Sequence, residues 1–295
     1  MNPDPKENRA WFTKKLFRGW RLAVVPHVPA TILCIFILVA LFAPQLSPYS
    51  PTEAHFLDKL MPPAWVEGGS SEYILGTDFM GRDVLSRLIH GSRVSMTVGM
   101  LVIVVAGSLG TVIGVISGYF GGWIDILLMR FTDITLSIPA ILMAIILVAL
   151  FGASYFNIIL VIVLLLWPRY ARQIRGDVLN VKEQEFVALA DVAGCSHIRI
   201  MWQHILPNVL PTILVLATLQ VGWVIILESS LSFLGVGIPP PQPAWGVMVA
   251  EARGLVSSAW WIALFPGLAI LFNVLSLNIL GDWLRDRLDP KLRSI

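Results

Sequence analysis

Among the features of this sequence, a series of long apolar runs restricts the possible folds of the chain most strongly. They fall approximately at residues 23–43, 94–117, 134–151, 155–167, 210–234 and 260–280. A helix needs about 20 mostly apolar residues to cross the hydrocarbon core of a bilayer. Inside hydrocarbon the backbone must satisfy its own hydrogen bonds, which favours helices over open strands. Only 14% of the residues are charged, too few to cover a soluble domain. We therefore predict an all-α polytopic membrane protein with about six transmembrane helices.

The positions of the Lys and Arg residues predict the orientation of these helices. With the N-terminus placed in the cytoplasm, sixteen of the 21 basic residues fall on the cytoplasmic side and five on the other. This bias matches the positive-inside rule, so both termini are expected inside. The predicted organisation is a cytoplasmic segment at 1–22, one transmembrane domain at 23–280 and a cytoplasmic tail at 281–295. The domain includes an outer loop at 44–91 and an inner loop at 168–208.

Several function classes are disfavoured by what the sequence contains. The net charge of +2 argues against a nucleic-acid partner. The two cysteines have no nearby histidine pairs, and the five histidines are scattered, so neither a metal site nor a catalytic centre is expected. The chain has no GxxxxGK[ST] phosphate-binding loop, so it is not expected to hydrolyse ATP by itself.

The inner loop has the pattern of two short helices separated by a glycine. Apolar residues recur at helical spacing before Gly194 and again after it, and Pro207 is expected to end the second helix. Such helices could dock in a groove on a partner protein or lie on lipid headgroups; the pattern alone favours neither. The apolar positions are Phe186, Leu189, Ala190 and Ala193, then Ile198, Met201, Trp202 and Ile205.

This inner pattern resembles the EAA loop of ABC importer permeases. The similar residues are Phe-Val-Ala-Leu-Ala-Asp-Val-Ala-Gly at 186–194 and His-Ile-Leu-Pro-Asn at 204–208. In that family the loop fits a cleft on the ATPase subunit and couples ATP hydrolysis to opening of the path. The sequence departs from the pattern where Ala188 and Leu189 replace the usual Glu and Ala. The resemblance assigns coupling to Phe186, Ala188, Leu189, Ala190, Asp191, Gly194, His204, Leu206 and Pro207.

The outer loop contains a second similar motif. The run Leu-Gly-Thr-Asp-Phe-Met-Gly-Arg-Asp-Val-Leu-Ser-Arg at 75–87 resembles the LGTDxxGRDVLSR motif of the dipeptide, oligopeptide and nickel branch. Thr77 or Asp78 is expected to cap a helix, and Asp78–Arg82 and Asp83–Arg87 have the spacing of i,i+4 ion pairs. We predict an amphipathic helix on the outer membrane face, whose charges brace it or grip a binding protein. The motif residues are Gly76, Thr77, Asp78, Gly81, Arg82, Asp83 and Arg87.

Further similar stretches lie at 118–122, 228–235, 239–246 and 281–293. The resemblance implies the type I importer fold with a cytoplasmic coupling-helix loop, in a bacterial inner (plasma) membrane. It also implies a second permease subunit, two ATPase subunits that bind ATP and Mg, an extracytoplasmic solute-binding protein and surrounding membrane lipid. No cofactor or metal is expected on this chain.

Three polar residues inside the predicted spans are candidates for lining a translocation path. Glu228 is the sole carboxylate of its span, and an ionisable group in a membrane is by default a functional hypothesis. It could instead lie near enough to the outer surface to reach water. Gln220 and Asn273 could line the path or make hydrogen bonds between helices.

We interpret the chain as half of the translocation path of an importer for di- or oligopeptides. The same permease role for nickel, opines, glutathione or sugars is an alternative that the motifs leave open. An ion-coupled secondary transporter is a remote alternative, because it predicts paired broken helices and several buried carboxylates.

Overall fold

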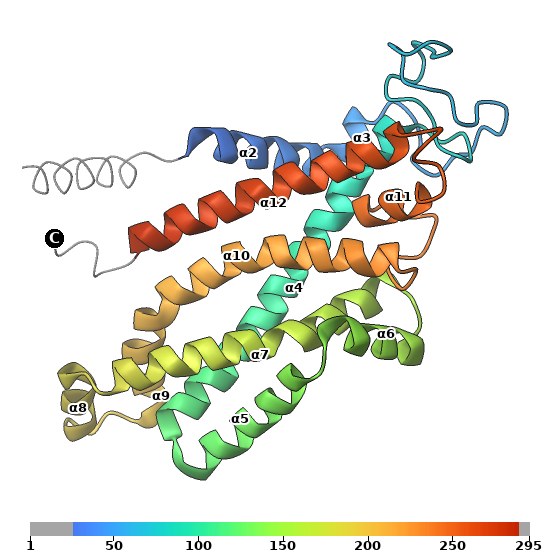
Figure 1. Cartoon of the computed structure of the whole chain (residues 1–295). Helices are drawn as coiled ribbons and strands as arrows, with labels where there is room; N and C mark the ends of the chain where they lie inside the picture. The colour runs from blue at the N-terminus through green and yellow to red at the C-terminus, as the bar shows by residue number, and fades with distance from the viewer. Residues whose placement is uncertain (1–25, 289–295) are drawn as a thin grey trace, which may run out of the picture.

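The computed structural model describes residues 26–288, and their regular structure is helical apart from one isolated bridge between Thr77 and Asp83. The predicted cytoplasmic segment 1–22 and the tail beyond residue 288 lie outside the described residues. Figure 1 shows the long helices side by side, with the loop before α4 at one end and α8 and α9 at the other. The elements are α2 (His27–Leu41), α3 (Ala43–Leu46), α4 (Val84–Phe120), α5 (Gly122–Ser137), α6 (Ala140–Phe151), α7 (Tyr155–Lys182), α8 (Glu185–Val192), α9 (His197–Ile200), the π-helical turn η1 (Met201–Ile205), α10 (Leu206–Phe233), α11 (Trp245–Glu251) and α12 (Trp261–Leu288).

Four helical stretches are long and apolar enough to cross a membrane. They are α4, α7, the run from α9 through α10 (His197–Phe233), and α12. The 28 residues of α7 or α12 span about 42 Å at the helical rise, more than the hydrocarbon core needs. The bent pair α5–α6 and the 15-residue apolar helix α2 occupy the other two predicted spans. The all-helical membrane fold is confirmed.

The third predicted span is not one straight helix. The chain bends by 92° between α5 and α6, where Ile138 has an extended backbone and Pro139 precedes α6. A residue before proline is disfavoured in the helical region, and proline lacks the N–H that a continuous helix needs. The fourth span differs too, because α7 continues beyond Trp167 to Lys182. Part of the predicted inner loop is therefore an extension of that helix.

Helices α4 and α7 pack closely through glycines. A Cβ atom added to Gly110 would lie 2.5 Å from both the Trp167 carbonyl oxygen and the Tyr170 Cβ. One added to Gly114 would lie 2.7 Å from the Ala171 carbonyl oxygen. Small residues allow helix backbones to approach one another, and this is the usual way that membrane helices pack without a hydrophobic driving force.

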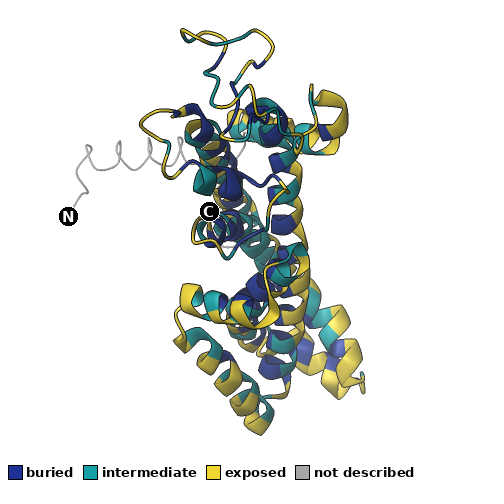
Figure 2. Ribbon diagram, turned by 90° about the vertical axis from the view of Figure 1, so that its right-hand side faces the viewer, coloured by how far each residue is buried: buried dark blue, intermediate teal, exposed yellow. Residues whose placement is uncertain are grey.

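The helices at the edge of the bundle expose large apolar side chains. In Figure 2 the buried residues follow the middle of the bundle, and the exposed ones lie along its outer helices. On α5, Trp123 is 72% exposed and Phe131 is 60% exposed. Soluble proteins rarely expose apolar surfaces of this extent to water. Lipid or other protein subunits therefore cover these side chains.

Candidate functional site

Residues 47–83, called here the long loop, precede α4 and carry the outer motif. The prediction of a helix over this motif is wrong: Gly76 to Asp83 are non-helical, and the helix begins at Val84. Asp83, not Thr77 or Asp78, caps it, because its Oδ2 accepts hydrogen bonds from the Ser86 amide (2.8 Å) and hydroxyl (2.6 Å). A side-chain oxygen in this position satisfies an N–H group that has no partner within the helix.

Thr77 and Gly81 hold the long loop together. The Thr77 hydroxyl accepts a hydrogen bond from the Met61 amide (2.9 Å) and donates one to the Asp58 carbonyl. Gly81 has φ +78°, and a Cβ there would lie 1.8 Å from the His55 carbonyl oxygen. Only glycine fits such a backbone and such a close approach. Gly76 lies at a similar positive-φ bend.

Asp78, Arg82, Arg87 and Glu251 form a buried group of charges, called here the Asp78 cluster. The Asp78 carboxylate accepts hydrogen bonds from Arg82 Nε (2.6 Å) and from Arg87 Nη1. Glu251, at the end of α11, accepts from Arg82 Nη2 (3.1 Å) and Arg87 Nη1 (2.7 Å). The predicted Asp78–Arg82 pair is present. The predicted Asp83–Arg87 pair is wrong, since the Asp83 carboxylate caps the helix and Arg87 turns to Asp78 and Glu251.

The Asp78 cluster balances its charges out of contact with water. The side chains of Asp78, Arg82 and Arg87 are at most 3% exposed, and that of Glu251 is 13% exposed. Two guanidinium groups face two carboxylates, so the net charge is zero. Removal of one partner from such a buried arrangement leaves a charge without compensation, which costs far more than the intact group contributes. The cluster thus fixes the long loop to α4 and α11.

At the other end of the bundle, residues 185–200 form two short helices around a bend, called here the α8–α9 segment. Gly194 makes the bend with φ +77°, and the Cys195 amide donates to the Ala190 carbonyl (3.1 Å). This is the left-handed glycine cap that ends many helices. The predicted sequence of helix, glycine bend and helix is therefore present.

The α8–α9 segment leaves most side chains of the predicted apolar faces exposed. Val187 and Ala190 of α8 pack with Ile200 and Ile205. The segment's other apolar side chains are exposed: Phe186 (41%), Leu189 (68%), Val192 (86%), Ile198 (70%) and, just beyond it, Trp202 (67%). Ala188, Asp191 and Ala193 are exposed too. The predicted apolar faces therefore remain largely uncovered within this chain.

The prediction that Pro207 ends the second helix is wrong. The chain widens into the turn η1, in which the Leu206 amide donates to the Met201 carbonyl five residues earlier. Pro207 then lies in the first turn of α10, directly after the widened turn, and the helical run that begins at His197 continues past it to Phe233. His204 lies within the widened turn, with its ring centroid 6.3 Å from that of Phe186.

Two residues that the sequence reasoning missed make contacts at the end of α4: Tyr119 contacts the α8–α9 segment, and Lys182, at the end of α7, contacts Tyr119. The Tyr119 hydroxyl lies 2.8 Å from His197 Nδ1, and the Lys182 ammonium donates to the Tyr119 carbonyl (2.5 Å). Glu251 of the Asp78 cluster was missed as well. The aromatic pair Tyr119–Phe120 before Gly121 was a sequence signal for the contact with His197. No local sequence pattern indicates the contact of Lys182 with Tyr119 or the place of Glu251 in the cluster.

The candidate path residues lie on α10 and α12. Glu228 is 1% exposed; its Oε1 accepts a hydrogen bond from the Ser232 hydroxyl (2.7 Å), and its Oε2 has no partner among the described residues. Asn273 is fully buried, and neither of its amide atoms has a partner in the described part of the chain. Gln220 is half-buried. Within residues 26–288, no group of three His, Cys, Asp or Glu side chains is arranged to hold a metal ion.

Comparison with known proteins defines the class to which this fold belongs. Residues 110–294 match the family described as binding-protein-dependent transport system inner membrane component, and residues 28–63 match the N-terminal transmembrane domain of oligopeptide transport permease C. The chain belongs to this family of importer permeases. A permease of this kind is a multi-pass inner-membrane protein that works with ATPase and binding-protein partners.

The similar proteins include permeases named for two solutes. The chain is 40% identical to the dipeptide transport system permease protein DppC of Haemophilus influenzae, over 96% of this chain and 94% of that protein. It is 46% identical to the protein of the same name from Escherichia coli K12, over 88% and 87%. It is 38% identical to the glutathione transport system permease protein GsiD of Pectobacterium atrosepticum, over 93% and 91%.

Proposed function

We propose that this permease forms half of the translocation path of an ABC importer for dipeptides and short oligopeptides. The observation that carries the proposal is its similarity, across nearly its whole length, to permeases named for dipeptide transport. The other half comes from a second permease, and two ATPase subunits with bound ATP and Mg drive the pair. An extracytoplasmic binding protein delivers the peptide.

The α8–α9 segment is the proposed docking surface for an ATPase subunit. Its exposed apolar side chains, which include Leu189, Val192 and Ile198, are available to fill a groove on a partner. Gly194 sets the angle between the two helices. His204, Leu206 and Pro207 connect the segment directly to α10, so a movement of the docked segment would be passed to a membrane-spanning helix.

The ends of the molecule are proposed to face opposite sides of the membrane. The α8–α9 segment and both termini lie in the cytoplasm, and the long loop faces the binding protein. In this arrangement the Asp78 cluster holds the long loop in the shape that the binding protein meets. Gln220, Glu228 and Asn273 are proposed to contribute to the path; the polar atoms of Glu228 and Asn273 that lack partners are consistent with a role completed by another subunit.

Glutathione is a second candidate solute, because a glutathione permease is 38% identical over 93% of the chain. Both solutes are peptides with free carboxylates. Reconstitution of the affinity-purified complex with its binding protein in liposomes separates the two. ATP-dependent uptake of labelled dialanine, with no uptake of labelled glutathione, supports the dipeptide importer. The reverse pattern assigns glutathione, and uptake without ATP would refute the importer.

A further inference from the structure

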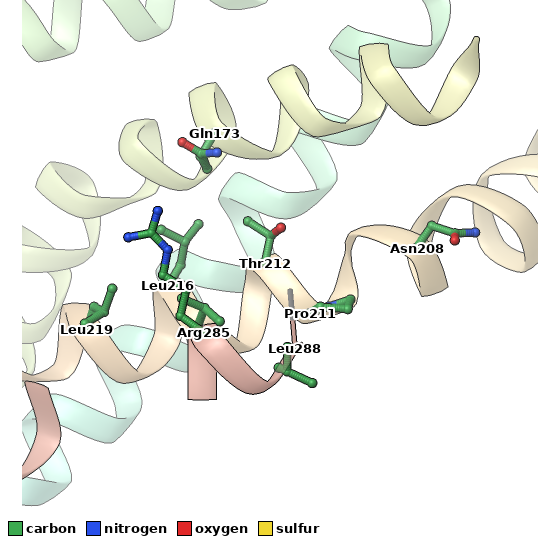
Figure 3. Close-up of a pocket in the computed structure, with 9 residues that line it drawn as sticks. Gln173, Asn208, Pro211, Thr212, Leu216, Leu219, Arg285 and Leu288 are labelled. Atoms are coloured by element: carbon green, nitrogen blue, oxygen red, sulfur yellow. The ribbon is translucent and has the colours of Figure 1, made fainter. Parts of the chain in front are cut away.

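A cavity of about 420 Å³ lies between α7, α10 and α12 at the end of the bundle that carries α8 and α9. Its volume is within the ~300–1,000 Å³ range of small-molecule sites. Gln173 of α7, Thr212 of α10 and Arg285 of α12 line it together with apolar residues such as Leu216. Figure 3 shows the Arg285 guanidinium extending from α12 toward α7, on the side of α7 that carries Gln173. Three separate helices thus each contribute a polar residue to the lining of one cavity.

Arg285 brings a positive charge that the rest of the described chain does not neutralise. No ion pair or hydrogen bond of its side chain is present among residues 26–288, and no carboxylate lines the cavity. A guanidinium group presents a planar fork of donors that matches a carboxylate. The Gln173 amide and the Thr212 hydroxyl can add neutral hydrogen bonds to the same anion.

A second cavity of similar size shows what an apolar groove in this protein looks like. It holds about 430 Å³ between α4 and the start of the α9–α10 run, and its lining is mainly aliphatic, with Trp202 and without any charged residue. The Arg285 cavity differs from this groove in having a charged residue in its lining. A lipid chain or an apolar partner helix needs only an apolar groove and would not require that charge.

We propose that the Arg285 cavity binds the terminal carboxylate of a peptide solute at the cytoplasmic end of the path. Arg285 holds the carboxylate, Gln173 and Thr212 complete its hydrogen bonds, and the apolar wall that includes Leu216 accepts side chains of different sizes. The cavity offers no anion to the peptide's ammonium group, so recognition is limited to the carboxylate end. This inference rests on the proposed function as a peptide importer.

The test is protection of a cysteine in the assembled permease–ATPase complex without its binding protein. Leu216→Cys is introduced after Cys34 and Cys195 are replaced by Ser, and the complex is placed in phosphatidylcholine nanodiscs. Dialanine and N-acetyl-dialanine at millimolar concentration should each slow modification by a polar maleimide at least threefold. Dialanine amide should not. Arg285→Gln should abolish the protection, and the matched variant Arg287→Gln, in the same helical turn but outside the cavity lining, should retain it.

Each other result overturns the inference. Equal protection by the amide, or protection that survives in Arg285→Gln, excludes carboxylate recognition by Arg285. If phosphatidylglycerol protects the cysteine and dialanine adds nothing, the cavity binds a lipid phosphate instead. ATP-driven uptake of dialanine by the complete wild-type importer is measured in parallel. Uptake without cysteine protection refutes this site alone, whereas absence of uptake refutes the proposed function.

Discussion

Replacement of Glu251 by Met is expected to destabilise the protein through the Asp78 cluster. The Glu251 carboxylate accepts three hydrogen bonds, two from Arg82 Nη2 and one from Arg87 Nη1. Without it, two buried guanidinium groups share the single carboxylate of Asp78, and the net charge rises from zero to +1. Breaking a buried ion pair costs about 3–5 kcal/mol. Because Glu251 keeps 13% of its side chain exposed, we expect the lower end, about 3 kcal/mol.

Two control variants separate the cost of breaking the ion pair from the general effect of replacing a carboxylate by Met. The double variant Arg87→Met with Glu251→Met leaves Asp78 and Arg82 as a neutral pair, so its loss should be smaller than the sum of the single losses by about 0.5–3 kcal/mol. Glu67, an exposed carboxylate on the same long loop, provides the control. Glu67→Met should change the free energy of unfolding by no more than about 0.5 kcal/mol.

The free energies of unfolding are measured by denaturant titration of the purified chain in mixed micelles. If Glu251→Met has the same free energy of unfolding as Glu67→Met, the argument that Glu251 neutralises buried positive charge in the Asp78 cluster is refuted. Strict additivity in the double variant would show that Arg87 and Glu251 do not interact.

Three further predictions concern other parts of the fold. Gly110→Leu should prevent α4 and α7 from packing and abolish recovery of folded protein in size-exclusion chromatography, while Gly176→Leu on α7, where no atom lies near an added Cβ, should be tolerated. Gly194→Pro should insert normally but lose solute-stimulated ATP hydrolysis in the assembled complex, because proline cannot adopt φ +77°; retained stimulation would contradict the docking role. Burial and, next, the Asp58 hydrogen bond raise the pKa of Tyr73 to about 12 from the ordinary 10. The protonated hydroxyl therefore stabilises the fold below pH about 10, and this contribution is lost as pH rises from about 10 to 12. The difference in thermal stability between wild type and Tyr73→Phe should be constant below this range and fall within it, and the tyrosinate absorbance that Tyr73→Phe removes should appear only as pH approaches about 12.

The membrane-spanning helices were predictable because apolar composition over about 20 residues determines where a chain can cross a bilayer. Because this composition is averaged over a window of about 20 residues, it concealed the bend between α5 and α6. Pro139 marked it locally, but apolar residues continue on both sides of the proline. The α8–α9 segment was predicted from spacing and Gly194, yet which of its apolar side chains are buried depends on the helices it packs against. Val187 and Ala190 are covered by residues of η1 and α9.

The Asp78 cluster shows a different limit of sequence reasoning. The i,i+4 rule predicted Asp83 as the partner of Arg87, but the start of α4 uses the Asp83 carboxylate as its cap. Glu251 lies 164 residues from Arg87 in sequence, and only the fold brings the two together. Arg285 was likewise no candidate, since its cavity exists only where three helices meet.

The length of α4 has a consequence for how the two ends of the molecule are related. Its 37 residues extend for about 55 Å at the helical rise. Arg87, near its first turn, belongs to the Asp78 cluster, and Tyr119, near its last, contacts His197 of α9. One uninterrupted helix therefore joins the surface proposed to meet the ATPase to the base of the long loop. A tilt imposed on α4 at Tyr119 is therefore transmitted to Arg87, so α4 links the α8–α9 end of the subunit mechanically to the Asp78 cluster at the other end.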